Sequence, residues 1–523
     1  MADRKPKNKI VWIIAIAMAL MLLLFAVLQF SAKRYVENLL NKKIPDHIHL
    51  VYDKIEVNLL TGSLLITDVT LDISNRNAGN EHTEMHLESI SMEGFGYYNY
   101  ILGNTIGADK IKLLNPKVRY YNDNTTNKIT SDKPLETGTE KVFVLDHLEI
   151  EDGEIVNIQN ETNTIKFTVE NFNLSLENLQ LDKETVTHKI PFSYGDYKLN
   201  TGKVYADLGP YEALSLSGTN IDKRVLQLSN LSLKSKYNKR TLSKKLDKEH
   251  DYIDLEIPKV RLVNMDFGFR AERFFLNTKS VVIQNPKMQI YRDKLVQDDF
   301  EQKKLYSQML RELPVDLNIS EVRIKDGYIA YSELVKTGTV PGEIVFSDLK
   351  ASMSNVSNIY ENEEKTEIMA KAKLMGEAPI ELTWNFDSKV GNDPFFVSGM
   401  VTNFKSKSIN QFLRSNLRAE AEGDVEELYF TLSGDAVSAS GDMKMNYEDF
   451  RFTVLKKDRM GVNKLLTFVG NIFTNDGSKS DKMGYRYGEI YAERDKTKSF
   501  FNYLWLNVMD GMVNTLTGDG EKD

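Results

Sequence analysis

The residues best suited to bind a metal ion are the histidines, and their spacing gives one candidate pair. The chain contains seven histidines and no cysteine. His82 and His86 are four residues apart, which on a helix would bring both rings within reach of a shared zinc ion. The segment runs into a predicted strand and has no evident third ligand, so we expect no metal site. His47 and His49 share one face of a predicted strand and likewise lack further ligands.

No motif of a known enzyme class occurs in the sequence. It has no Gly-x-Ser-x-Gly nucleophile motif, no phosphate-binding glycine loop and no His-Glu-x-x-His zinc motif. The lack of cysteine excludes disulfides, thiolate metal sites and cysteine nucleophiles. Acidic residues are abundant, but they alternate with apolar residues, as is typical of a solvated sheet face. We predict that the protein is not an enzyme and binds no cofactor.

The overall charge argues against a nucleic-acid-binding protein. The formal net charge is -8, so the chain lacks the basic surface that contacts phosphates. Hydrophobic residues make up 41% of the chain, which is enough to form folded cores. We therefore expect folded domains and no nucleic-acid partner.

Most of the chain from His47 onwards has the pattern of β-strands. From Ile165 to Val169 and from Phe172 to Leu176, apolar and polar residues alternate strictly, which indicates a sheet with one hidden and one solvated face. Helical patterns are few, and we expect them at Leu295–Leu313, Ser408–Leu417, Val462–Phe473 and Ser499–Leu516. The sequence therefore predicts a mainly β fold with a helical C-terminus.

The β region contains a tandem duplication. Leu87–Tyr121 aligns without a gap with Ile257–Tyr291, and Asn115-Pro116-Lys117 recurs as Asn285-Pro286-Lys287. We expect the two copies to have the same number of strands in the same order, because a one-residue slip would turn every side chain to the other face. Pro116 should then lie over Pro286.

Two short sequence pairs in each copy predict where strands end. Asp152-Gly153 and Asp326-Gly327 are predicted to be type I′ hairpin turns, for which Asp-Gly supplies the positive φ angles. A turn explains these aspartates structurally, without a catalytic role. The Asn-Pro pairs should end one strand and begin another, because proline cannot donate a hydrogen bond to a sheet.

An apolar run near the N-terminus predicts a membrane anchor. Nineteen apolar residues run from Ile10 to Leu28 and would form a helix roughly 29 Å long, enough to cross a bilayer core. Basic residues flank both ends in equal number, but those before the run are more tightly clustered, so we expect a cytoplasmic N-terminus. The anchor residues include Ile10, Trp12, Leu22, Phe25 and Leu28.

These patterns divide the chain into six segments. They are a cytoplasmic tail (1–9), a transmembrane helix (10–30), a first β-repeat unit (50–220), a second β-repeat unit (221–358), a C-terminal β-module (359–453) and a C-terminal helical segment (454–523). The last segment should hold an amphipathic helix that either caps the core or contacts a second membrane or a partner. Its apolar stripe includes Phe501, Leu504, Trp505, Val508 and Met512.

The two ends of the chain resemble a known family. The anchor followed by Leu59-Leu60-Thr-Gly-Ser-Leu64, and later Ile409-Asn-Gln-Phe-Leu413 and Ala439-Ser-Gly441-Asp-Met-Lys-Met, are similar to the opening and the C-terminal module of AsmA-like bacterial envelope proteins. This resemblance implies a single-pass inner-membrane protein with an elongated, curved antiparallel β-sheet in the periplasm. It also implies an apolar groove and a role in outer-membrane lipid homeostasis.

Candidate lipid-facing residues are the equivalent apolar positions of the two copies. They are Ile111, Leu113, Val118 and Tyr120 in the first copy and Val281, Ile283, Met288 and Ile290 in the second. A closed protein core would require the same spacing of apolar residues in both copies, so this pattern is compatible with two functions. One is the sheltering of phospholipid acyl chains in an apolar groove. The other is a non-catalytic structural or assembly role, with an outer-membrane or envelope protein as a partner through the C-terminal helix.

Overall fold

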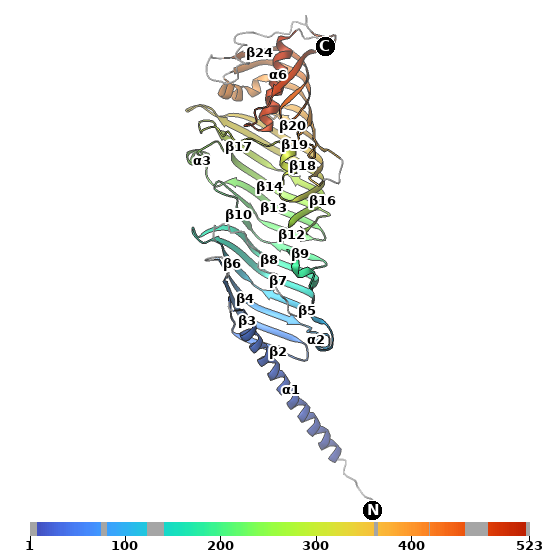
Figure 1. Cartoon of the computed structure of the whole chain (residues 1–523). Coiled ribbons are helices and arrows are strands. Elements are labelled where there is room, and N and C mark those ends of the chain that lie inside the picture. Colours follow the sequence, from blue (N-terminus) through green and yellow to red (C-terminus); the bar gives the residue numbers. More distant parts are fainter. Residues whose placement is uncertain are drawn as a thin grey trace, which may run out of the picture. The chain divides into compact units, whose positions relative to one another are not determined.

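The protein has a mainly β structure. The computed structural model describes residues 8–45, 47–74, 81–122, 141–359, 364–417, 419–454 and 480–518. Strands account for 58% of the chain and helices for 16%, which confirms the predicted fold class at that level. The strands belong to a large curved sheet (Figure 1). The chain divides into two compact units, unit 1 (1–207 and 218–223) and unit 2 (208–217 and 224–523).

Unit 1 begins with the long helix α1 (Asn8–Lys43) and continues as a series of strands joined by short connections. In chain order the further elements are β1 (Ile48–Val51), β2 (Lys54–Asn58), β3 (Ser63–Ser74), β4 (His82–Glu93), α2 (Tyr97–Leu102), β5 (Thr105–Leu114), β6 (Lys117–Asn122), β7 (Val142–Gln159), β8 (Thr164–Leu181), a 3₁₀ turn (Thr185–Thr187), β9 (Tyr197–Thr201), β10 (Val204–Asp207) and β12 (Gly218–Asp222).

Unit 2 contains the second copy and the C-terminal part of the chain. Its elements are β11 (Glu212–Leu216), β13 (Val225–Ser235), α3 (Lys239–Lys245), β14 (Tyr252–Val263), β15 (Asp266–Arg270), β16 (Arg273–Gln284), β17 (Lys287–Asp293), α4 (Tyr306–Arg311), β18 (Asp316–Leu334), β19 (Gly342–Ser357), β20 (Thr366–Leu374), β21 (Ala378–Phe386), β22 (Phe395–Lys405), a 3₁₀ turn (Ser406–Ile409), α5 (Asn410–Phe412), a π turn (Leu413–Leu417), β23 (Ala419–Gly434), β24 (Ser438–Val454), β25 (Arg486–Glu493) and α6 (Phe500–Thr517).

The two copies share their strand pairings. In unit 1, β4 pairs antiparallel with β5 and β6, and both of these pair parallel with β7. In unit 2, β14, β16, β17 and β18 pair in the same way. The Asn-Pro steps end one strand and begin the next, as predicted. The parallel pairings differ from the expected antiparallel sheet. In the second copy, the connection that contains α4 returns the chain, so that β18 runs in the same direction as β17.

The expectation of equal strand numbers is wrong at one place. The connection between β4 and β5 contains α2, whereas the equivalent part of the second copy forms β15, a strand paired with the start of β16. Phe267 and Phe269 alternate with polar residues or glycine along β15, which suits a strand, whereas glycines at 96 and 103 bound α2. The two copies therefore share the same strand pairings but differ in the connection that follows β4 and β14.

The Asp-Gly pairs are not hairpin turns, which corrects the prediction. Each lies inside one long strand, Asp152 in β7 and Asp326 in β18. Their φ angles are 55° and 52°, so a single residue enters the left-handed region while the strand continues beyond it. Aspartate tolerates this conformation, and the local register shift is that of a β-bulge. Positive φ occurs at the two aspartates but not at Gly153 or Gly327, so the predicted turn geometry is wrong for the glycines.

Two of the four predicted helical segments are helical in the structure, one is helical only in part, and one lies outside the described residues. Only Tyr306–Arg311 of the Leu295–Leu313 stretch is helical, because the preceding residues form an irregular crossover towards β18. The stretch Ser408–Leu417 is helical, although it is divided among 3₁₀, α and π turns. Val462–Phe473 lies outside the described residues. The C-terminal helix is confirmed as α6, whose N-cap Ser499 accepts a hydrogen bond from the amide of Asn502 at 3.3 Å.

The N-terminal apolar run lies in α1, and the structure describes only some of the side chains of this helix. Ile10, Trp12 and Phe25 have side chains outside the described residues, whereas Leu22 and Leu28 are exposed. Among the residues that the structure describes, no helix is sufficiently long and apolar to span a membrane.

Candidate functional site: the apolar face of the sheet

An unbroken row of aliphatic side chains crosses unit 1. Each member is the direct cross-strand partner of the next, so neighbouring side chains share one face of the sheet. The row runs over β2, β3, β4, β5, β7, β8, β9 and β12 and consists of Ile55, Ile66, Ile90, Leu113, Ile150, Leu174, Leu199 and Ile221. At about 4.8 Å per strand, these eight residues span roughly 34 Å.

Two further apolar rows lie on either side of this one. The first consists of Val57, Leu64, Met92, Ile111, Leu148, Leu176 and Tyr197. The second consists of Leu50, Leu71, Met85, Val118, Ile155, Val169 and Val204. Together the three rows form a broad hydrophobic surface, which we call the apolar face of unit 1.

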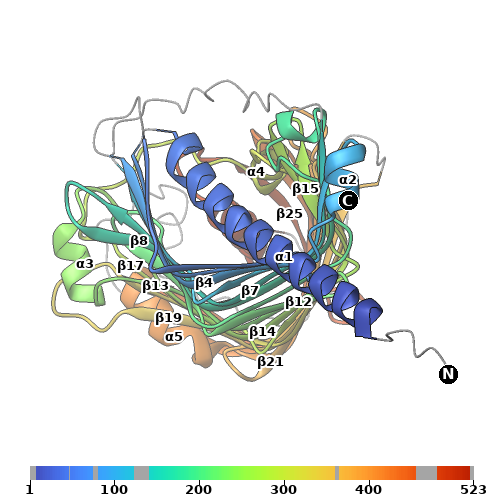
Figure 2. The same ribbon diagram turned by 90° about the horizontal axis from the view of Figure 1, so that it is seen from below.

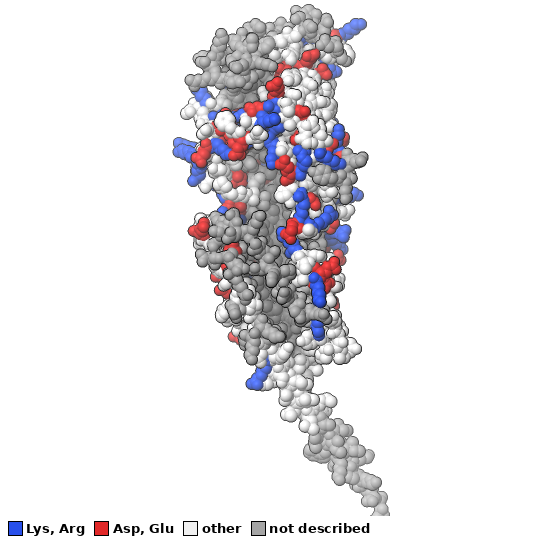
Figure 3. Space-filling view, in the orientation of Figure 1, with Lys and Arg blue, Asp and Glu red and all other residues white. Residues whose placement is uncertain are grey.

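The opposite face of the same strands is polar. One of its rows consists of Glu56, Leu65, Ser91, Lys112, Glu149, Ser175, Lys198 and Asp222. Lys112 lies 2.7 Å from Glu151, and Lys110 lies 2.6 Å from Glu149. These exposed pairs contribute little to stability but keep this face solvated. Basic and acidic side chains are interspersed on the surface that Figure 3 shows.

Residues with positive φ bend the strands of unit 1. Asp68, Asn115, Asp152 and Asn171 have φ angles between 48° and 55°, and each lies within or between long strands. The apolar spacing changes from two to three residues at such a point, as from Ile66 to Val69, and both side chains remain on the apolar face. The bends therefore curve the sheet without turning apolar side chains to water, and Figure 2 shows bent strands such as β4 and β7 along their length.

Helix α1 covers only the beginning of the apolar face. Val36 and Leu40 of α1 pack against a buried cluster formed by Ile55, Ile66, Val69 and Leu87. Beyond this cluster, most members of the three rows are only partly buried. In the described part of unit 1, α1 on β2 and α2 on β5 are the α-helices in extended contact with strands. No second sheet of described residues lies over these rows.

Unit 2 contains similar apolar rows, but other parts of the protein cover one end of them. One row consists of Leu228, Val260, Ile283, Ile324, Ala351, Ala370 and Leu382. Another consists of Leu226, Leu262, Val281, Val322, Met353, Ile368, Trp384 and Val397. Their far ends enter a large buried core, where Leu310 of α4, Phe412 of α5 and Tyr503 of α6 pack together with the strands. The apolar rows of unit 2 are thus covered by protein at this end.

Five of the eight predicted lipid-facing residues lie on these rows, namely Ile111, Leu113, Val118, Val281 and Ile283, whereas Tyr120, Met288 and Ile290 belong to other cross-strand pairs. Ile111, Leu113, Val118 and Tyr120 are partly buried, and burial raises the pKa of the Tyr120 phenol. In the second copy Val281 is buried, whereas Ile283, Met288 and Ile290 are partly buried. Sequence reasoning missed most other members, including Ile150 and Leu174. The alternation of apolar and polar residues along the chain indicates that these side chains share a face with their neighbours. The pairing of their strands, however, could not be predicted from the sequence.

Helix α6 is a core cap whose buried side overlaps only in part with the predicted apolar stripe, which also contains Met509 and Leu516. Its buried residues are Phe500, Tyr503, Asn507, Met509, Gly511, Thr515 and Leu516. Asn507 Nδ2 donates to the carbonyl of Tyr503 at 2.8 Å, whereas its buried Oδ1 accepts no hydrogen bond from the described residues. Of the predicted stripe, Leu504, Val508 and Met512 pack at the edge of the core, Trp505 is partly buried, and Phe501 is 57% exposed.

A cluster of charged residues lies at one end of the rows in unit 2. Arg292 binds Asp251 through two hydrogen bonds of 2.7 Å, and Lys294 lies 2.9 Å from Glu249. Glu333 accepts a hydrogen bond of 3.3 Å from Asn416 of the π turn. Burial raises the pKa of Glu333. The bond between Glu333 and Asn416 joins the end of β18 to the π turn.

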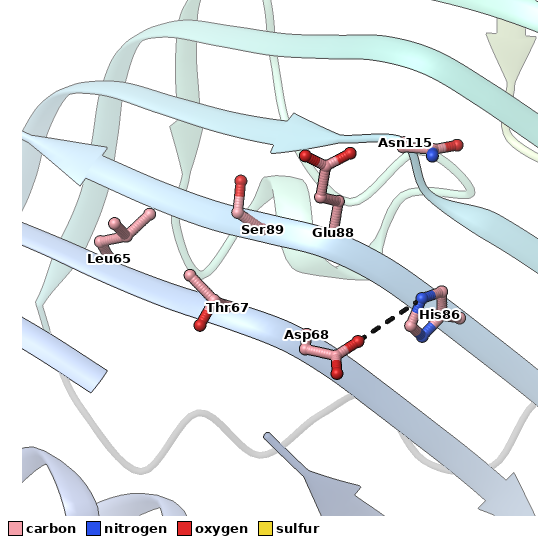
Figure 4. Close-up of a pocket in the computed structure, with 7 residues that line it drawn as sticks. All are labelled: Leu65, Thr67, Asp68, His86, Glu88, Ser89 and Asn115. Carbon is pink, nitrogen blue, oxygen red and sulfur yellow. Dashed lines mark ion pairs between the residues drawn. The ribbon is translucent and has the colours of Figure 1, made fainter. Parts of the chain in front are cut away.

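The histidines form no metal site among the described residues. His82 and His86 lie on strand β4 instead of a helix. His86 Nε2 lies 3.7 Å from Asp68 in a shallow depression on the polar face (Figure 4). The depression is lined by Leu65, Thr67, Asp68, His86, Glu88, Ser89 and Asn115. Both ionisable partners of the pair are largely exposed, so this arrangement suits solvent contact better than catalysis.

Comparison of the sequence with models of known families and with curated proteins finds no match. The resemblance to AsmA-like proteins therefore stays a prediction.

Proposed function

We propose that this protein is anchored in the bacterial inner membrane and shelters phospholipid acyl chains on the apolar face of its periplasmic sheet. The single observation that carries the proposal is the set of three apolar rows in unit 1, whose opposite face is polar. A hydrophobic surface of this extent needs a covering layer. No sheet or helix of the described residues supplies that layer beyond the cluster beneath α1.

The energetics favour such a surface for lipid. Moving an acyl chain of about 16 methylenes into water costs on the order of 13 kcal/mol, at about 0.8 kcal/mol for each methylene. A lipid that leaves a bilayer therefore needs a continuous apolar path. The central row of unit 1 spans roughly 34 Å, about twice the thickness of one leaflet's hydrocarbon layer. One acyl chain fits along it.

The connection between α1 and the sheet supports this function. The apolar run Ile10–Leu28 would cross the membrane with the N-terminus in the cytoplasm, and the same helix continues to Lys43. Its last turns place Val36 and Leu40 against Ile55 and Val69, where the apolar face begins. A lipid that follows α1 out of the bilayer would meet this face directly.

The closed end of unit 2 favours the second candidate function, a structural or assembly role in the envelope. There α4, α5 and α6 fill the apolar face with protein. In this case the sheet would be a scaffold, and α6 would carry the contact with an envelope partner through residues such as the exposed Phe501.

The phospholipid content of the purified full-length protein distinguishes these functions. After extensive exchange into a lipid-free detergent, we expect phospholipid to remain bound, as measured by mass spectrometry of organic extracts. Leu113→Asp combined with Ile150→Asp should reduce that amount, because both changes place charge in the central row. Lys112→Asp with Glu149→Lys, on the polar face of the same strands, is the control. Equal lipid content in all three proteins would contradict the proposal.

A further inference from the structure

A group of exposed apolar side chains lies where α1 meets the sheet. Leu60 in the β2–β3 turn is 78% exposed, and Tyr98, Ile101 and Leu102 of α2 are 75%, 71% and 73% exposed. We call these four residues the rim patch. Single exposed apolar residues are common, but four such residues on two adjoining connections need an explanation.

Hydrogen bonds fix the rim patch beside one point of α1. The side chain of Gln29 donates to the carbonyl of Val57, and its Oε1 accepts from the amide of Leu59 at 3.0 Å. Gln29 is the first polar residue after the apolar run that ends at Leu28. The β2–β3 turn, and with it Leu60, is therefore held at the level where the apolar run ends.

The same turn also holds α2. The amide of Phe95 donates to the carbonyl of Gly62 at 3.0 Å. A Cβ atom on Gly62 would lie 2.8 Å from the Phe95 nitrogen, so this close approach needs glycine at a φ of 61°. Tyr97 and Tyr100 then pack against the Phe95 ring, with centroids 5.2 and 5.5 Å apart. Figure 1 shows α1, β2 and α2 at the same end of unit 1.

Residues around the rim patch have the composition of a membrane interface. Phe30 and Tyr35 of α1 are exposed just beyond the apolar run. Arg34 lies over the Phe30 ring at 4.6 Å, and Lys141 lies over the Tyr100 ring at 4.5 Å. Aromatic residues and basic side chains concentrate where a protein meets the headgroups of a bilayer.

The second copy provides an internal comparison. At the positions equivalent to Ile101 and Leu102 it has Ala271 and Glu272, and the surrounding connection forms the β15–β16 hairpin instead of a helix. The apolar character of α2 is therefore not a requirement of the repeated fold. It occurs only in the copy that adjoins α1.

We propose that the rim patch docks on the headgroup and acyl boundary of the bilayer that α1 enters, which holds the start of the apolar face against the lipid surface. This inference rests on the membrane anchor of the proposed function. Docking at two points, α1 and the rim patch, would fix the orientation of unit 1 relative to the membrane. Lipid could then pass from the leaflet to Ile55 and Ile66 over a short path.

The test uses single cysteines, which the cysteine-free chain makes straightforward. Full-length Leu102→Cys is labelled with the environment-sensitive fluorophore NBD and reconstituted into vesicles of phosphatidylethanolamine and phosphatidylglycerol. Lipids with a spin label near the top of the acyl chain should quench about half of its emission, because interfacial segments lie roughly 5–10 Å into this region. Glu272→Cys, the equivalent position of the second copy, should show no quenching.

A third label separates failure of this inference from failure of the anchor. Leu22→Cys lies within the apolar run and should be quenched by lipids with the spin label deeper in the chain. Quenching at 22 without quenching at 102 would overturn rim docking and leave the anchor standing. No quenching at either position would overturn both. Blue-shifted emission at 102 without lipid quenching would mean that protein covers the rim patch, which also contradicts the inference.

Discussion

Leu113 lies directly opposite Ile150 across the parallel pairing of β5 with β7, and the equivalent pair in the second copy is Ile283 and Ile324. The register is therefore the same in both copies. Because direct cross-strand partners share a face, this register places the equivalent apolar residues of each copy on one side of the sheet. The central claim is that this side, in unit 1, is a surface for lipid.

A charge in the central row should affect lipid binding more than stability. Leu113 is partly buried, so a glutamate there can keep its carboxylate hydrated. We expect Leu113→Glu to lower the free energy of unfolding by about 1 kcal/mol, the size of an ordinary substitution, while lipid binding is lost. Thermal unfolding followed by circular dichroism, together with lipid extraction, measures both effects.

The matched control for that substitution lies in the closed core of unit 2. Val397 is fully buried, with 0% of its side chain exposed. Val397→Glu would bury a carboxylate among apolar side chains and should cost more than about 4 kcal/mol. If Leu113→Glu unfolds the protein as severely as Val397→Glu, the apolar face of unit 1 is a closed core and the groove does not exist.

The two bulge glycines should respond differently to alanine. A Cβ atom on Gly153 would lie 2.3 Å from the ring of Phe172, whereas one on Gly327 would lie 3.2 Å from Pro286. We expect Gly153→Ala to cost about 1–3 kcal/mol by overpacking and Gly327→Ala to cost clearly less. Chemical denaturation of the two variants tests this order, and the reverse order would show that the two bulges pack differently from this description.

The docking of α6 depends on close approach to β25. A Cβ atom on Gly488 would lie 2.4 Å from the backbone nitrogen of Thr515 in α6. Gly488→Val should therefore loosen the helix, at a cost of about 1–3 kcal/mol, and should make the C-terminus sensitive to limited proteolysis. Gly391→Val, at a position with no described atom within 4 Å, should leave the cleavage pattern unchanged. Resistance of both variants would mean that α6 is not held at this contact.

Glu333 should make stability depend on pH. Burial raises the pKa of its carboxyl above the ordinary value of 4.5. The folded protein then holds this proton more tightly than the unfolded chain, so the free energy of unfolding should fall as the pH rises from about 4.5 through the raised pKa. Glu333→Gln should remove this part of the pH dependence, and Glu377→Gln, at an exposed position, should not. Identical pH profiles for the parent and Glu333→Gln would refute this role.

The strand pattern and the duplication could be predicted because they follow from local periodicity. The alternation around Ile165 and Phe172 and the repeated Asn-Pro pairs each correspond to strands or strand breaks in the structure. Pairing could not be predicted in the same way. Whether Asp152 begins a hairpin or bends a continuing strand depends on the partner strand β8, which is itself displaced by Asn171.

The buried side of α6 was missed for a related reason. An apolar stripe through Phe501 and Trp505 is the strongest signal in the sequence. The core instead contains Asn507 and Thr515, whose side-chain donors bond to the carbonyls of Tyr503 and Gly511 in the same helix. Such local bonds make a polar residue suitable for burial, and hydrophobicity alone does not reveal them.

The most direct test of the lipid surface is site-specific crosslinking in cells. The photoreactive amino acid p-benzoylphenylalanine is placed at Leu113 or Ile283 on the apolar face, and at the adjacent Lys112 or Val282, which point to the other face. After irradiation of cells grown with radiolabelled phosphate, the purified protein is examined for covalently bound phospholipid. We expect label at 113 and 283 and none at 112 and 282. Absence of label at 113 and 283, or equal label at all four positions, would contradict lipid binding to the apolar side of the sheet.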